Sequence, residues 1–160
     1  MSEYRVRWFV RKDTVDVLRI DAESFAKPWN ESMLREWMKR RDVIGMVCEV
    51  DGEIVGYVVY QLTKNYVEVI SIAVAKAHRR QEIGKYLVQN VVKKMQQAYM
   101  PSIRVSVKES NLGAHLFWRA MGLRCTGIIK NKGVEDAYFF EWFDLSVDAC
   151  ASFVDAAESR

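Results

Sequence analysis

The stretch VEVISIAVAKAHRRQEIGKYL, residues 67–87, decides the fold that the sequence predicts. Residues 67–75 are almost continuously apolar, which is typical of a strand buried on both faces. Residues 76–82 are basic, and a helical pattern begins at Ile83 with Leu87 facing inward. Exposed N–H groups at a helix start, with Arg and Lys side chains nearby, can bind an anion. The stretch therefore predicts a buried strand, a basic turn and a helix in direct succession, and the turn is either a solvated surface turn or an anion-binding site.

Hydrophobic periodicity and turn residues predict further elements on both sides of this stretch. The predicted order is strand 4–9, helix 14–25, a helix from Asn30 or Ser32 to about Arg41, strands 46–50, 54–62 and 67–75, helix 83–99, strand 103–107, helix 111–121, and strands 123–129 and 137–144. Strands with intercalated helices and antiparallel hairpins indicate an α/β (α+β) domain with a mixed sheet over residues 1–145. Residues 146–160 are expected to form a surface helix or a frayed tail.

Length and charge exclude several classes of protein. A chain of 160 residues favours one domain, and a net charge of +3 is too small to indicate a nucleic-acid binder. The start of the chain mixes charged and apolar residues, unlike a signal peptide, and no apolar run reaches the roughly 18 residues of a membrane span. A cytoplasmic location without membrane contact is therefore expected.

The cysteines and histidines give no metal-binding pattern. Three cysteines at wide spacing form neither a disulfide framework nor a zinc motif, and two histidines occur without an H-E-x-x-H motif. Cys48 and Cys125 lie in apolar runs and are expected to be small buried hydrophobes. No metal is expected.

Residues 79–84, RRQEIG, resemble the acyl-CoA loop of the GNAT N-acetyltransferase superfamily, Arg/Gln-x-x-Gly-x-Gly/Ala. Arg79 and Gly84 match that motif, and Glu82 occupies its first glycine position. Residues 25–31, FAKPWNE, resemble the segment between the first two helices of RimI-like ribosomal-protein alanine acetyltransferases.

Two later segments extend the resemblance. Residues 107–123 are similar to the RimI-like pattern V-x-x-S-N-x-x-A-x-x-L-Y-x-x-x-G-F, and residues 135–138, EDAY, match a motif of archaeal and eukaryotic N-terminal acetyltransferases. The matches occur in order over residues 4–145.

This resemblance implies a mostly antiparallel sheet split by a V between parallel strands 67–74 and 103–107, with helices on both faces. It implies that acetyl-CoA lies in the V and that the Ile72 N–H polarises the thioester carbonyl. Glu82 is expected to turn outward, because a carboxylate beside a pyrophosphate is repulsive. The residues implied for cofactor binding are Ile72, Ala73, Val74, Arg79, Arg80, Gln81, Glu82, Ile83, Gly84, Lys85 and Asn111.

Three positions bear on catalysis. Glu68 is the lone candidate base on the central strand and lies, by spacing, where histone acetyltransferases of the superfamily have their catalytic Glu; the alternative is a strand-end Glu that faces solvent or pairs with an arginine. Ser106 falls where RimI-like enzymes have a base. Trp118 falls at their general-acid Tyr, and its indole N–H is far too weak an acid to replace a phenol fully.

The acceptor is expected to be a primary amine that attacks the thioester directly. At pH 7, deprotonation costs about 1 kcal/mol for an α-amine and about 4.6 kcal/mol for lysine, which favours a protein N-terminus. Lys130-Asn131-Lys132 replaces the tyrosine pair that clamps peptides in many N-terminal acetyltransferases. The residues expected at the acceptor are Trp29, Asn30, Glu31, Ser106 and Tyr138.

Two alternatives remain open. The altered clamp also suits an enzyme that acetylates a small-molecule amine. The departures at Glu82, Ser106 and Trp118 also suit a non-catalytic acyl-CoA-binding regulatory domain. The chain is expected to be a monomer or a homodimer.

Overall fold

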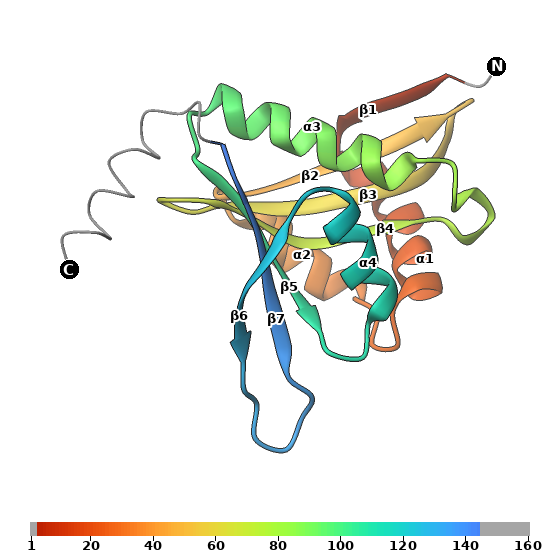
Figure 1. Cartoon of the computed structure of the whole chain (residues 1–160). Helices are drawn as coiled ribbons and strands as arrows, with labels where there is room; N and C mark the ends of the chain where they lie inside the picture. Colours follow the sequence, from red (N-terminus) through yellow and green to blue (C-terminus); the bar gives the residue numbers. More distant parts are fainter. Residues whose placement is uncertain (1–2, 145–160) are drawn as a thin grey trace. The chain divides into compact units, whose positions relative to one another are not determined.

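The structure, a computed structural model, describes residues 3–144 (Figure 1). The predicted tail at 146–160 lies outside the described residues. The strands are β1 (Tyr4–Trp8), β2 (Val43–Val50), β3 (Glu53–Leu62), β4 (Val67–Val74), β5 (Ser102–Lys108), β6 (Arg124–Ile129) and β7 (Ala137–Phe143). The helices are α1 (Thr14–Ser24), α2 (Glu31–Lys39), α3 (Ile83–Gln97) and α4 (Leu112–Ala120), with short 3₁₀ turns at Arg11–Asp13 and Lys76–His78.

Within residues 3–144 the strands form one mostly antiparallel sheet in the order β1-β2-β3-β4-β5-β7-β6. The parallel pair is β4 with β5, and its register covers Val67↔Ile103 to Val69↔Val105. Strands β5 and β7 pair antiparallel over the full length of both. The prediction of a mixed α/β sheet with one parallel pair is confirmed.

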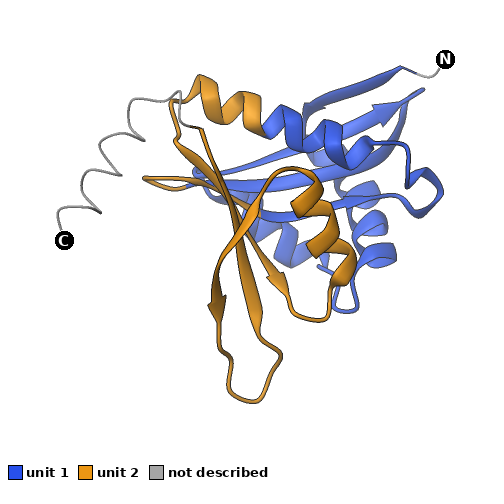
Figure 2. Cartoon of the chain, in the orientation of Figure 1, with its two compact units in different colours: residues 1–62, 70–91 blue, residues 63–69, 92–160 orange. Residues whose placement is uncertain are grey.

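The chain divides into two compact units, which Figure 2 shows in different colours. Unit 1 comprises residues 1–62 and 70–91, and unit 2 comprises residues 63–69 and 92–160, described up to residue 144. The division passes through β4 and α3. Each unit is therefore described by itself.

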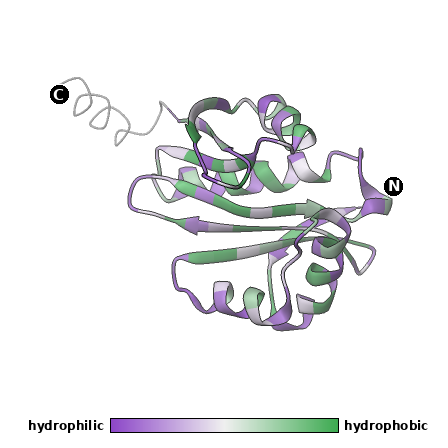
Figure 3. Ribbon diagram, turned by 90° about the horizontal axis from the view of Figure 1, so that it is seen from below, coloured by the Kyte–Doolittle hydropathy of each residue, from purple (hydrophilic) through white to green (hydrophobic). Residues whose placement is uncertain are grey.

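In unit 1, helices cover both faces of the strands (Figure 1). Val17 of α1 and Leu34 of α2 pack in one core cluster with Tyr57 and Val59 of β3. Side chains alternate between faces along a strand, so Gly56 faces the other side, where α3 lies. Figure 3 shows long hydrophobic stretches along several of the strands.

Gly56 permits the close approach of α3 to β3. A Cβ at this position would lie 3.1 Å from Ile83 Cγ2, 3.2 Å from Leu87 Cδ1 and 3.3 Å from the Ala73 carbonyl oxygen. Ile83 and Leu87 are themselves almost fully buried. Because Gly56 has no side chain, the first turns of α3 can pack closely against the sheet.

In unit 2, α4 packs against one face of the β5–β7 ladder. The ring of His115 meets Tyr138 and Phe140 edge-on, with centroid distances of 5.4 and 5.3 Å. Phe140 and Trp118 are buried. Strand β6 pairs only with β7 and forms one edge of the sheet.

Two details differ from the sequence predictions. Strand β2 begins at Val43, because its register with β3 continues from Val43↔Gln61 through Gly45. Cys48 is buried as predicted, whereas Cys125 is exposed, because it lies on edge strand β6.

None of the helices in residues 3–144 has the length and apolar character needed to cross a bilayer. The same residues contain no group of three or more His, Cys, Asp or Glu side chains placed to hold a metal ion.

We predict that Gly56→Ala lowers stability by about 1–2 kcal/mol, because the new methyl group overpacks the contact between β3 and α3. Thermal unfolding should show a melting temperature lower by roughly 2–8 °C. Gly127→Ala is the control, since its Cβ would meet Phe139 Cδ2 at an ordinary 3.6 Å. Equal melting of the Gly56 variant and wild type would contradict this account.

Candidate active site

The turn between β4 and α3 has an unusual backbone. Arg80 and Glu82 adopt φ values of +65° and +62°. This left-handed region is unfavourable for residues with a Cβ and favourable for glycine. Glu82 occupies the position at which the acyl-CoA loop motif has its first glycine, so the backbone follows that motif although the residue does not.

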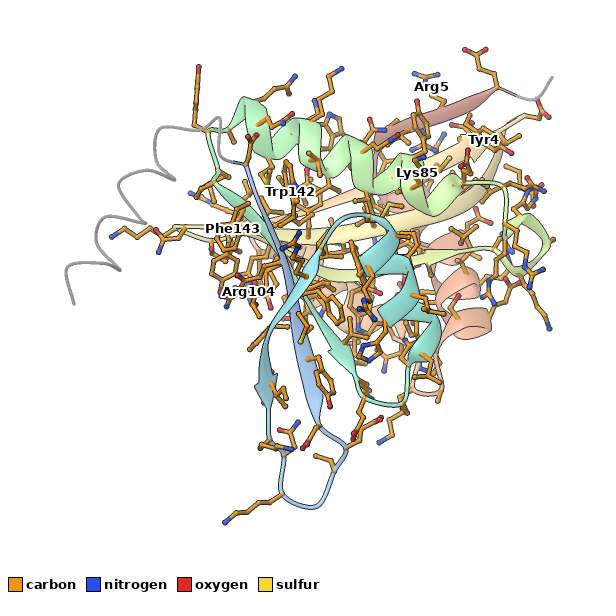
Figure 4. All side chains as sticks on the ribbon, viewed as in Figure 1. Tyr4, Arg5, Lys85, Arg104, Trp142 and Phe143 are labelled. Atoms are coloured by element: carbon orange, nitrogen blue, oxygen red, sulfur yellow. The ribbon has the colours of Figure 1, made fainter. Side chains whose placement is uncertain are left out.

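The turn leads directly into α3, and the N–H groups at the start of this helix have no hydrogen-bond acceptor within it. Tyr86 donates the first helical hydrogen bond, to the Glu82 carbonyl, at 3.0 Å. The N–H groups of Ile83, Gly84 and Lys85 come before it and have no acceptor within the helix. Lys85 lies in this first turn and is labelled in Figure 4. The helix start can therefore bind an anionic group such as a pyrophosphate.

The Glu82 side chain points to solvent, as expected. It is 80% exposed, and its carboxylate lies 3.8 Å from Lys85 Nζ. The carboxylate leaves the helix start open, but it partly neutralises the lysine there.

Arg79 and Gln81, which were also expected to bind the cofactor, form hydrogen bonds that stabilise the turn. Arg79 donates from Nε to the Val74 carbonyl at 3.1 Å and from Nη2 to Ser24 Oγ at 3.0 Å. Gln81 Oε1 accepts the hydroxyl of Tyr4, which lies on β1 and is labelled in Figure 4, at 2.9 Å. These hydrogen bonds fix the turn to α1, β4 and β1. Arg79, Arg80 and Lys85 are all exposed, and of these three Arg79 is the one that hydrogen bonds hold to α1 and β4.

The β4 backbone presents polar groups beside the turn. Ala75 donates its N–H to the Val55 carbonyl of β3. Because N–H directions alternate along a strand, the Ile72 and Val74 N–H groups point away from β3. The β4–β5 register ends at Val69, before either residue. This placement is compatible with the expectation that the Ile72 N–H polarises the thioester carbonyl.

Of the expected acceptor residues of unit 1, Trp29 and Asn30 lie between α1 and α2, and Glu31 is the first residue of α2. Trp29 stacks on Trp37 with a centroid distance of 6.3 Å. The Asn30 side chain caps α2 by accepting the Met33 N–H at 2.9 Å, and Glu31 pairs with Arg35 at 2.7 Å. The contacts of Trp29 and Asn30 thus connect this loop to α2, whereas the Glu31–Arg35 pair lies within α2.

A buried carboxylate that the sequence analysis missed holds the same loop. Asp21 accepts the Trp29 N–H with one oxygen and the Tyr57 hydroxyl with the other, and that hydroxyl lies 2.9 Å from Ser71 Oγ. Burial, and then the bond to Asp21, raise the pKa of Tyr57 above its ordinary value. An aspartate on the apolar face of a helix, four residues after Val17, was the signal available in the sequence.

Unit 2 holds the remaining predicted residues. Ser106 is exposed and lies opposite Phe139 in the β5–β7 register. Trp118 is 2% exposed and packs on Phe117. Asn111 caps α4 by accepting the Ala114 N–H at 3.1 Å.

Glu68 is half-buried on the unit 2 part of β4. Within the described part of the chain, no hydrogen bond or ion pair reaches its carboxylate, so the alternative in which it pairs with an arginine is not what the structure shows. The neighbouring Arg104 pairs with Glu141 instead.

The EDAY segment fixes the β6–β7 hairpin. The Glu135 carboxylate accepts the Ser110 N–H at 3.0 Å, and Asp136 accepts Lys130 Nζ at 2.7 Å and the Asn131 N–H at 3.1 Å. These bonds hold the pKa of both carboxyls below the usual values. The hairpin is therefore ordered at the Lys130-Asn131-Lys132 segment without the tyrosine pair.

The sheet with one parallel pair, and a glycine-type turn into a helix start, together define an acyltransferase of the GNAT type. The sequence model of the Acetyltransferase (GNAT) family matches residues 14–123, and the chain belongs to this family. An N-alpha-acetyltransferase of Sulfurisphaera tokodaii is 26% identical over 152 residues, covering 86% of this chain and 91% of the relative.

Solved structures share the fold. The ribosomal-protein-S18-alanine N-acetyltransferase from Escherichia coli superposes with a TM-score of 0.80 at 18% identity, over 88% of this chain and 94% of that one. Arabidopsis thaliana NAA60 in complex with acetyl-CoA gives a TM-score of 0.74 at 17% identity, over 88% and 98%.

We predict that Glu82→Gly binds acetyl-CoA about fivefold more tightly, because it removes a negative charge near the helix start and the Cβ from a left-handed position. Isothermal titration would measure the change. Glu82→Gln separates the two causes, since it removes the charge and keeps the Cβ. Unchanged or weaker binding by the glycine variant would contradict the assignment of this turn.

Proposed function

We propose that this acyltransferase transfers the acetyl group of acetyl-CoA to the α-amine of a protein N-terminus. The observation behind the proposal is the turn at residues 79–85, where left-handed Arg80 and Glu82 precede helix N–H groups that have no acceptor within the helix. Such a turn suits a pyrophosphate. When bound, acetyl-CoA supplies an acetyl group activated as a thioester.

The chain supplies two further functions in this proposal. The Ile72 N–H, on the side of β4 away from β3, would donate a hydrogen bond to the oxyanion. Glu68 would accept a proton from the acceptor amine, directly or through water, since its carboxylate has no partner within residues 3–144. A carboxylate such as Glu68 is a weak base, and a weak base is sufficient for an α-amine because its deprotonation at pH 7 costs only about 1 kcal/mol.

The name of the archaeal relative supports an N-terminal acceptor, and its match extends over most of both chains. The loop between α1 and α2, with its Trp29–Trp37 stack, provides an aromatic surface on which a peptide could bind. In this proposal Ser106 faces the acceptor, because it projects from the same face of unit 2 as Glu68 and Arg104. Tyr138, which was also expected at the acceptor, projects from the opposite face, against His115 of α4.

A small-molecule amine is the second candidate. The segment Lys130-Asn131-Lys132 is tied to Asp136 and has no aromatic clamp. A small acceptor would need no clamp. Release of free CoA thiol in the presence of a panel of N-terminal peptides and a panel of small amines separates the two.

Turnover with peptides but not with small amines is expected, and the reverse result would favour the second candidate. Absence of acetyl-CoA binding in a titration at millimolar concentration would overturn both.

We predict that Glu68→Gln lowers kcat about 100-fold, at the lower end of the range for general acid–base catalysis. The pH–rate profile should also lose the acid limb that belongs to the carboxylate. Glu53→Gln, another glutamate on a strand but exposed at the start of β3, is the matched control and should behave like wild type. An unchanged rate and profile in the Glu68 variant would show that another group accepts the proton.

A further inference from the structure

Four charged side chains lie in one row across the strands of unit 2, and the outermost is Arg124 of β6, which is opposite Glu141. Glu68 of β4 is opposite Arg104 of β5, and Arg104 is opposite Glu141 of β7. Directly opposed residues on neighbouring strands project from the same face, with strands about 4.8 Å apart. The row therefore places a guanidinium between two carboxylates, either of which it could bind.

The guanidinium binds Glu141. Arg104 donates from Nε and Nη2 to Glu141 Oε1, and the Glu141 side chain is only 8% exposed. Two rings hold the guanidinium in place: its central carbon lies 4.4 Å from the ring centroid of Tyr66 and 4.9 Å from that of Phe139. Stacking and ion pairing thus fix one of the two possible pairings. Arg104 is labelled in Figure 4.

Glu68 is the carboxylate in this row that Arg104 does not bind. Within unit 2, the titratable and charged groups on its face are the Tyr66 phenol, Arg104, Lys108, Glu141 and Arg124, of which Arg104 is the one directly opposite Glu68. Helix α4 lies against the other face, where His115 meets Tyr138 and Phe140. In the part of the chain that the structure describes, the Glu68 carboxylate has no bonded partner.

We propose that Glu141 is a positioning residue that holds Arg104 away from Glu68 and so keeps Glu68 basic enough to accept a proton. The proposal rests on the proposed function, in which Glu68 is the base. An arginine close to a carboxylate stabilises the ionised form and weakens it as a base. While Glu141 neutralises Arg104, that effect on Glu68 is small.

The kinetic test compares Glu141→Gln with wild type in the peptide assay. Loss of the Glu141 charge leaves Arg104 to act on Glu68, so kcat should fall about threefold to tenfold and the acid limb should move about one pH unit lower. Glu36→Gln, which removes an exposed ion pair with Lys39, is the matched control and should leave both unchanged. Thermal melting reports separately on folding.

Two double variants distinguish positioning from a merely structural role. In a Glu68→Gln background, Glu141→Gln should have no further effect on kcat, because the residue through which it acts is gone. Adding Arg104→Met to Glu141→Gln should recover most of the lost rate, because the freed cation is removed with its partner. Additive losses with Glu68→Gln would overturn the proposal.

A second readout needs no turnover, so it also separates this proposal from the proposed function. Side-chain carboxyl ¹³C NMR would follow the titration of Glu68, assigned by the loss of its signal in Glu68→Gln. The midpoint should move lower in Glu141→Gln, higher in Arg104→Met, where Glu141 loses its counter-charge, and little in the double variant. Unmoved midpoints in the single variants would overturn the positioning role even if the enzyme is active. Shifted midpoints without turnover of any amine would leave it standing and overturn the proposed function.

Discussion

The close contact of α3 with β3 at Gly56 sets the geometry of the candidate cofactor site. Ile83 and Leu87 lie against the bare backbone of β3, so α3 must start close to the sheet and soon after the end of β4. In the turn that joins them, Arg80 and Glu82 lie in the left-handed region. Any helix start has N–H groups without an intrahelical acceptor, so the packing determines where these groups lie relative to the sheet.

Some polar and charged side chains around this turn stabilise the protein itself, and others are available to a ligand. Arg79 closes hydrogen bonds to Val74 and to the end of α1, and Gln81 holds Tyr4, so these side chains stabilise the turn rather than extend from it. Lys85 and Arg80 stay exposed. The same division recurs in unit 2, where Arg104 is committed to Glu141 and Glu68 is not. In both places hydrogen-bond geometry determines which charges can act on a ligand.

Much of the site could be predicted because it depends on local sequence. The apolar run at 67–75, the basic segment and the helix starting at Ile83 are near neighbours in the chain, and the structure has them where the pattern predicted them. The outward orientation of Glu82 followed from charge repulsion alone. By contrast, Asp21 contacts Tyr57 and Ser71 across long sequence separations, and no periodicity reports such a contact.

The sequence by itself determined the order of strands and helices, the basic turn before the helix at Ile83 and the resemblance to acetyltransferases, because hydrophobic periodicity and short motifs act over a few residues. Only the tertiary structure decided that Cys125 is exposed on an edge strand, that Asp21 orders the loop at Trp29, and that Arg104 pairs with Glu141 rather than Glu68. Each of these depends on the register between strands or on packing between distant segments, which brings together groups whose spacing in the chain is unrelated to their distance in space.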